Sequence, residues 1–116
     1  MAKVDKTIHM IADTTIKDLY TVPASTKSRI ASIVVGNVNS ATKYFTLYHL
    51  PSGQAVADTY VIGGKLKKLE GTLGDYGAGE YVYEVPFPMA VGDKLTIVSE
   101  TANTMVVKAT VIEEGI

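Results

Sequence analysis

The chain contains no cysteine and no tryptophan among its 116 residues. Without cysteine it has no disulfide bond, no thiolate nucleophile and no thiolate metal ligand. Its two histidines, His9 and His49, lie far apart in the sequence, and neither has a neighbouring ligand at a spacing typical of metal sites. No serine lies in the G-x-S-x-G turn of a hydrolase. We therefore expect neither an enzyme nor a cofactor.

The chain also lacks an excess of charge and a long apolar segment. Its 11 basic and 12 acidic residues give a formal net charge of -1. Nucleic-acid binding usually needs a basic surface that displaces counterions from phosphates, so no nucleic-acid partner is expected. No apolar run approaches the roughly 18 residues of a membrane helix. Asp5 and His9 also interrupt the N-terminal apolar stretch, so we expect no signal peptide, no membrane contact and synthesis in the cytoplasm.

What the sequence does contain is alternation of apolar and polar residues, which is typical of strands buried on one side. In "KYFTLYHL", Phe45 and Leu47 share one face, while Tyr44, Thr46 and Tyr48 share the other. Turn-forming residues recur about every 8–15 residues, as in a sandwich or small barrel. The predicted strands span residues 15–22, 28–38, 43–50, 54–62, 65–70, 80–86, 93–100 and 104–113.

These strands predict an all-β fold, a single antiparallel β-sandwich of about eight strands with a Greek-key or jelly-roll-like order. The sandwich domain is expected over residues 13–116. Residues 1–12 are expected to be a short N-terminal arm, which is ordered only if it packs on something. The Gly63–Gly64 pair argues against a helix in the middle of the chain.

One segment, "RIASIVVGNV", has two apolar faces. Strict alternation places Ile30, Val34 and Val38 on one face. Ala31, Ile33 and Val35 then fall on the opposite face. A strand of this kind is either central in a covered sheet or covered by another chain.

The glycine-rich segment between Gly74 and Glu80 is a candidate ligand loop. A calcium loop needs an alternating acidic run, and here only Asp75 and Glu80 are acidic. A phosphate-binding loop needs a following helix, whereas the next segment is a predicted strand. A plain surface loop is the preferred interpretation, and a small-molecule ligand is not expected.

The seven tyrosines allow three interpretations. Tyr44 and Tyr48 would share the outward face of one strand, and Tyr81 and Tyr83 would share a face of another. Such rings can form a sugar-binding platform, a contact between subunits, or ordinary packing.

The order of these elements resembles that of small β-sandwich virion proteins of tailed bacteriophages. The first matching segment is "LYTVPASTKSRIASIVVGNVNSATKYFTLYHLPSGQ", where a Tyr-x-Val-Pro turn leads into a strand that ends in Asn. The second is "VPFPMAVGDKLTIVSETANTMVVKATVIEE", where a Gly-Asp-x-Leu turn starts the penultimate strand. The resemblance covers roughly residues 13–114, and the segment "GGKLKKLEGTLGDYG" matches least well.

The resemblance implies a protein of the virion, assembled in the host cytoplasm, that decorates the capsid and cements neighbouring capsomers. Its implied partners are the major capsid protein and its own copies, in a homotrimer. A tail or neck adaptor, or a carbohydrate- or receptor-binding module, is the alternative. The residues expected at the interface are Ile8, Met10, Ile30, Val34, Val38, Tyr44, Tyr48, Tyr81, Tyr83 and Ile112.

Overall fold

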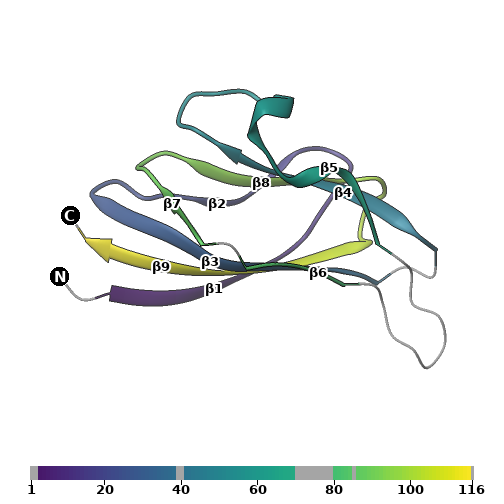
Figure 1. Cartoon of the computed structure of the whole chain (residues 1–116), viewed down its shortest axis with the longest axis horizontal. Helices are drawn as coiled ribbons and strands as arrows, with labels where there is room; N and C mark the ends of the chain where they lie inside the picture. The colour runs from purple at the N-terminus through teal and green to yellow at the C-terminus, as the bar shows by residue number, and fades with distance from the viewer. Residues whose placement is uncertain (1–2, 39–40, 70–79, 85, 116) are drawn as a thin grey trace.

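The structure is a computed structural model that describes residues 3–38, 41–69, 80–84 and 86–115. These residues form nine strands in two antiparallel sheets that pack face to face (Figure 1). The strands are β1 (Lys3–Ile11), β2 (Lys17–Thr21), β3 (Thr26–Asn37), β4 (Lys43–Leu50), β5 (Val61–Leu69), β6 (Glu80–Tyr83), β7 (Phe87–Met89), β8 (Lys94–Ser99) and β9 (Met105–Gly115). The predicted all-β sandwich is confirmed. Within the described ranges the structure contains no helix of the length and apolar character that a membrane crossing needs.

The strand order is that of a jelly roll. One sheet, here called the β1 sheet, runs β1-β9-β3-β6, and β7 also pairs with β3. The other, the β2 sheet, runs β2-β8-β4-β5. Strands β1 to β4 alternate between the two sheets. Later in the chain, β5 and β8 belong to the β2 sheet, and β6, β7 and β9 belong to the β1 sheet. This is the strand arrangement of a double-sheet jelly roll built from two Greek keys. Because β1 and β9 are neighbours, the two ends of the chain lie at the same end of the sandwich (Figure 1).

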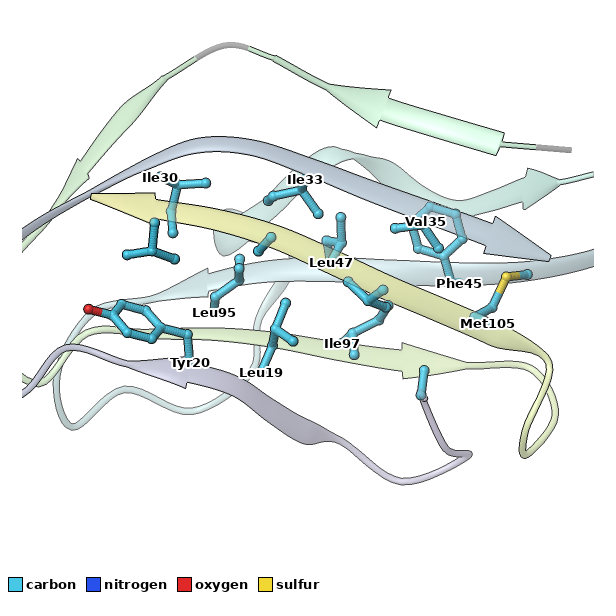
Figure 2. Packing of buried hydrophobic residues seen from close by; sticks show 14 of the residues in the cluster. Leu19, Tyr20, Ile30, Ile33, Val35, Phe45, Leu47, Leu95, Ile97 and Met105 are labelled. Atoms are coloured by element: carbon cyan, nitrogen blue, oxygen red, sulfur yellow. The ribbon is translucent and has the colours of Figure 1, made fainter. Parts of the chain in front are cut away.

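The core lies between the sheets and is filled by the apolar half of each alternating strand. β3 contributes Ile33 and Val35, and β4 contributes Phe45 and Leu47 from the opposite sheet (Figure 2). These side chains are almost completely buried. Burial of each contributes about 1.5–3 kcal/mol to stability. The alternation seen in the sequence therefore sets which face of each strand packs inward.

Residues 3–11 of the predicted arm form β1, which pairs with β9 along its whole length. The inward side chains Ile8 and Met10 are half-buried and pack against the core. The segment is therefore ordered by packing on the chain's own last strand, as an edge strand of the β1 sheet.

The prediction that Ile30 shares a face with Val34 and Val38 is wrong. A β-bulge interrupts the pairing of β3 with β9 between Ile30 and Ser32. A bulge adds one residue and reverses the alternation beyond it. Ile30 therefore points into the core together with Ile33, and it is 0% exposed (Figure 2).

The middle of the chain also departs from the predicted strands. The strand predicted at 54–62 is wrong over most of its length, because Asp58–Tyr60 form a short 3-10 helix, η1, and β5 begins only at Val61. The strand predicted at 65–70 is the second half of β5. β7 was not predicted. The glycine-rich segment from Gly74, considered above as a calcium or phosphate loop, lies outside the described residues.

Candidate assembly surfaces

The structure distributes the predicted interface residues over several surfaces. Val34 and Ile112 stand on the outer face of the β1 sheet, and Val38 follows β3 at the end of the same sheet. Val38 is the most exposed of the three, at 55%. Tyr44 is half-buried on the outer face of the β2 sheet, near Lys68 and Glu100. Only the first three share a surface on which a partner can contact them together.

Two of the predicted interface residues are buried within the chain itself. Ile30 is in the core, as described above. Tyr48 is only 6% exposed, although its strand position places it on the outer face of the β2 sheet. The helix η1 contacts β4 and lies over this face of the sheet (Figure 1). The prediction that Tyr44 and Tyr48 form an exposed platform is therefore wrong. The sugar-binding interpretation that rests on these two rings is wrong as well.

Tyr81 and Tyr83 face inward, at the open edge of the sandwich between β5 and β6. They belong to a row of rings that joins the two sheets. The ring centroids of Tyr81 and Phe45 are 5.7 Å apart, and those of Tyr81 and Tyr83 are 6.5 Å apart. The row continues from Tyr83 to Phe87 at 6.1 Å, and from Phe87 to His49 at 5.2 Å. Aromatic pairs at such spacings stabilise a fold beyond the area they bury, so the row holds this edge closed.

The backbone of β5 is shaped to receive Tyr81. A Cβ atom built at Gly63 would lie 1.9 Å from the Tyr81 hydroxyl oxygen, and Gly63 has a φ of 75°. Only glycine meets both conditions without strain. The ammonium group of Lys67, on the same strand, lies 5.1 Å from the centroid of the Tyr81 ring. Burial, followed by the neighbouring Tyr83, raises the pKa of Tyr81.

A cleft of about 360 Å³ lies beside the row of rings, lined among others by His49, Tyr60, Tyr83 and Phe87. The histidine in this lining is hydrogen-bonded to an aspartate. His49 Nε2 lies 3.0 Å from Asp93 Oδ2 and donates a hydrogen bond to it. Among the described residues, no side-chain hydroxyl group is hydrogen-bonded to His49 or Asp93.

Asp93 is a structural carboxylate. It accepts hydrogen bonds from the backbone N–H groups of Ser52, at 3.1 Å, and Ala90, at 3.0 Å. Burial alone would raise the pKa of Asp93, but the hydrogen bonds from His49, Ala90 and Ser52 together outweigh burial and lower this pKa. The carboxylate therefore ties the β4–β5 and β7–β8 connections together in its charged form.

A second polar cluster joins the two sheets near the ends of the chain. The Tyr20 hydroxyl donates to Glu113 Oε2, and the Ser28 hydroxyl donates to the Tyr20 oxygen at 3.1 Å. Lys6 Nζ lies 2.8 Å from Glu113 Oε1. Burial and the bond to Glu113 raise the pKa of Tyr20 to about 12. The hydrogen bonds from Lys6 and Tyr20 lower the pKa of Glu113.

Both clusters consist of contacts within the fold. Each polar group in them is hydrogen-bonded to another strand or turn of the same chain. Over the described ranges, no three or more acidic, histidine or cysteine side chains lie close enough together to hold a metal ion.

The outer face of the β1 sheet carries a further group of apolar side chains. Val82 on β6 pairs directly with Val34 on β3, and Val82 is 45% exposed. Ile11 on β1 pairs with Val106 on β9 at the same end of the sheet. We call Ile11, Val34, Val82 and Val106 the apolar end of this face, although Lys108, the β9 partner of Val34, stands beside them. These four side chains belong to the outward-facing set of alternating strands, and of the four only Val34 was among the predicted interface residues.

At the other end of the same face lies a shallow basin of about 260 Å³. Ile112 and Pro88 supply its apolar lining, and its charged groups are Lys3, Lys27, Arg29 and Glu114. Sequence reasoning identified Ile112 alone, because the basin is made by strands that are distant in the sequence.

No protein-family model matches the chain, and no curated protein matches it. Solved structures do match. A chain of the disulfide-linked pili formed by Bacillus endospore appendages aligns over 99% of this chain and 88% of its own length, with a TM-score of 0.52 and 14% identity. A chain in the acid-stable capsid of the Helicobacter pylori bacteriophage KHP30 aligns over 97% and 87%, with a TM-score of 0.56 and 7% identity. At these identities the likeness shows a shared fold.

Proposed function

We propose that the chain is a non-enzymatic structural protein of a virus particle, and specifically a capsid decoration or cement protein that bridges neighbouring capsomers. The proposal rests on one observation. The space between the two sheets is filled by the chain's own side chains, whereas the outer face of the β1 sheet exposes apolar side chains such as Val82. The chain's ionisable clusters hold the two sheets and the turns together, while the apolar end of the β1 sheet is left outside.

The fold is consistent with this role, since jelly rolls build many viral capsid domains. The capsid chain of bacteriophage KHP30 shares the fold over nearly the whole length of this chain. The pilus chain shares it as well, but those pili are disulfide-linked. The present chain has no cysteine, so its copies would associate without disulfide links.

We place the contact with the capsid on the outer face of the β1 sheet. Exposed valines there can be buried by a partner, at about 25 cal/mol per Å² of apolar area. The partners are then the major capsid protein and further copies of the chain, located in the virion. The homotrimer implied by the resemblance, and a neck or tail position in place of the shell, stay predictions.

The experiment is co-sedimentation of the purified chain with capsids that lack it, produced from the same genome. We expect saturable binding to many sites per particle. Val82→Lys would place a charge in the apolar end and should weaken binding at least about tenfold, since burial of an unpaired charge is costly. Val91→Lys is the matched control, because Val91 is 43% exposed in the turn before β8 and lies outside this face. Absence of binding by the native chain, or equal binding by both variants, would contradict the proposal.

A further inference from the structure

The sheet edges of the described chain differ in how well they can pair with another strand. The edge strand β5 contains Gly63, Gly64 and Leu66 with positive φ, and its register with β4 shifts. The register of β2 also shifts, and β6 and β7 have four and three residues. β1 has nine residues in unbroken register with β9. A long, regular edge is a template for pairing with another chain.

The hydrogen bonds next to β1 show which of its backbone groups are available. Just beyond β1, the Ala12 N–H donates to Met105 O at 2.8 Å. In an antiparallel pair, hydrogen-bonded residues alternate with residues whose N–H and C=O groups point away. The even-numbered residues of β1 therefore face β9. The groups that point away from the sheet belong to Lys3, Asp5, Thr7, His9 and Ile11, and of these the Ile11 carbonyl accepts a hydrogen bond from Lys17 Nζ at 3.4 Å.

These five residues form a self-complementary series centred on Thr7. If two copies of β1 pair antiparallel about a two-fold axis at Thr7, Asp5 of each copy lies opposite His9 of the other. Thr7 then faces Thr7, and all nine residues of both strands overlap. A Thr–Thr pair of this kind contributes roughly 0.2–1 kcal/mol, and each Asp5 carboxylate can accept a hydrogen bond from the imidazole opposite it.

Other two-fold registers are less favourable. An axis at Asp5 or at Lys6 places like charges directly opposite each other, which is destabilising. An axis at His9 brings the two histidines together and leaves Asp5 without a partner on the other strand. An axis at Ile8 loses the contact between Asp5 and His9 and shortens the overlap. The Thr7 register alone gives both the full overlap and two Asp–His contacts.

We propose that two copies of the chain associate edge to edge through β1, in antiparallel register about a two-fold axis at Thr7, so that their β1 sheets become one continuous sheet. The inference rests on the proposed function, because it names the contact through which copies of a shell protein join. The contact leaves the outer face free for the capsid, and it can link two single chains or two trimers.

Lys6 could oppose this contact, because inward-pointing charges protect many sheet edges from pairing. Here its ammonium group is neutralised within its own chain by Glu113, at 2.8 Å. In the Thr7 register Lys6 lies opposite Ile8 of the other copy, so the two lysines stay apart. A single ribbon is small beside the ~1,600 Å² of a standard interface. We therefore expect weak pairing in dilute solution and stronger pairing on a particle that holds many copies.

Cysteine cross-linking tests this register directly. Because the chain has no cysteine of its own, every disulfide must form at the introduced residue. Residues opposite each other in a hydrogen-bonded pair have Cα atoms about 5.5 Å apart, which a disulfide can span. Thr7→Cys should therefore form a disulfide-linked dimer under mild oxidation. In the same register the two copies of Asp5→Cys, or of His9→Cys, are about 13 Å apart and should stay monomeric. Thr14→Cys, exposed in the turn after β1, measures the rate of chance collisions.

Dimer formation by Thr7→Cys at least about tenfold faster than by the other three variants would support the proposal. Faster cross-linking through Asp5→Cys or His9→Cys would overturn the register, and equal rates for all four would overturn the pairing. Adding His9→Glu should slow the Thr7→Cys reaction, and a further Asp5→Lys should restore it. Because these reactions use the free protein, their failure is distinct from a failure to bind capsids.

Discussion

The closure of the β5–β6 edge by Tyr81 gives a sharp prediction about stability. Gly63→Ala introduces a methyl group 1.9 Å from the Tyr81 hydroxyl oxygen, at a φ of 75°. The backbone term costs about 1 kcal/mol, because an L-residue is disfavoured in the left-handed region. The ring of Tyr81 must also move away, which weakens its contacts with Phe45 and Lys67 by roughly 1–2 kcal/mol together. We expect a total loss of about 2–3 kcal/mol in the free energy of unfolding.

Urea unfolding of four variants separates the two terms. Gly53→Ala is the control for the backbone term, since Gly53 has a φ of 78° with nothing within 4 Å of the added methyl group, and it should cost only about 1 kcal/mol. In a Tyr81→Phe background the nearest remaining contact of Gly63→Ala is the ring carbon Cζ at 3.0 Å, so the substitution should cost about 1 kcal/mol less than in the native chain. Equal costs for Gly53→Ala and Gly63→Ala, or no recovery with Tyr81→Phe, would refute the reasoning.

Two further predictions concern the polar clusters. Tyr20→Phe removes the hydroxyl that bonds Glu113 and Ser28, and chemical denaturation should show a loss of about 2 kcal/mol; an unchanged midpoint would contradict a role of the cluster in joining the sheets. Because the pKa of Asp93 is lowered in the folded chain, its stabilising effect is complete above the ordinary carboxyl pKa and is lost as the pH falls through the folded value. The stability difference between the native chain and Asp93→Asn should therefore shrink on acidification, and a difference that is constant from about pH 6 to 3 would show that the carboxylate charge is not what matters.

Local alternation was sufficient to predict most strands, because it depends only on which side of a strand is buried. β4 begins and ends at the predicted residues, and Phe45 and Leu47 point inward as expected. Alternation failed where the backbone adds a residue. The bulge beyond Ile30 reverses which side chains of β3 point inward, and no residue type near it predicts a bulge. β7 was missed because Pro88 stands inside a strand of three residues.

The surfaces were harder to predict than the core. Tyr48 looks like an exposed ring in the sequence, but it is only 6% exposed, and the helix η1 in the connection after β4 contacts its strand. The basin around Ile112 and the free edge of β1 depend on which strands become neighbours and which are left at the edge. That order is a property of the whole jelly roll, which local patterns do not contain.

The central claim is that the chain acts by its position in a particle. The most direct measurement is quantitative mass spectrometry of purified virions produced from the genome that encodes it, with the major capsid protein as the internal standard. The account predicts the chain in the particles at a copy number comparable to that of the capsomers. Its absence from purified virions, or its presence in only a few copies, would contradict the cement role.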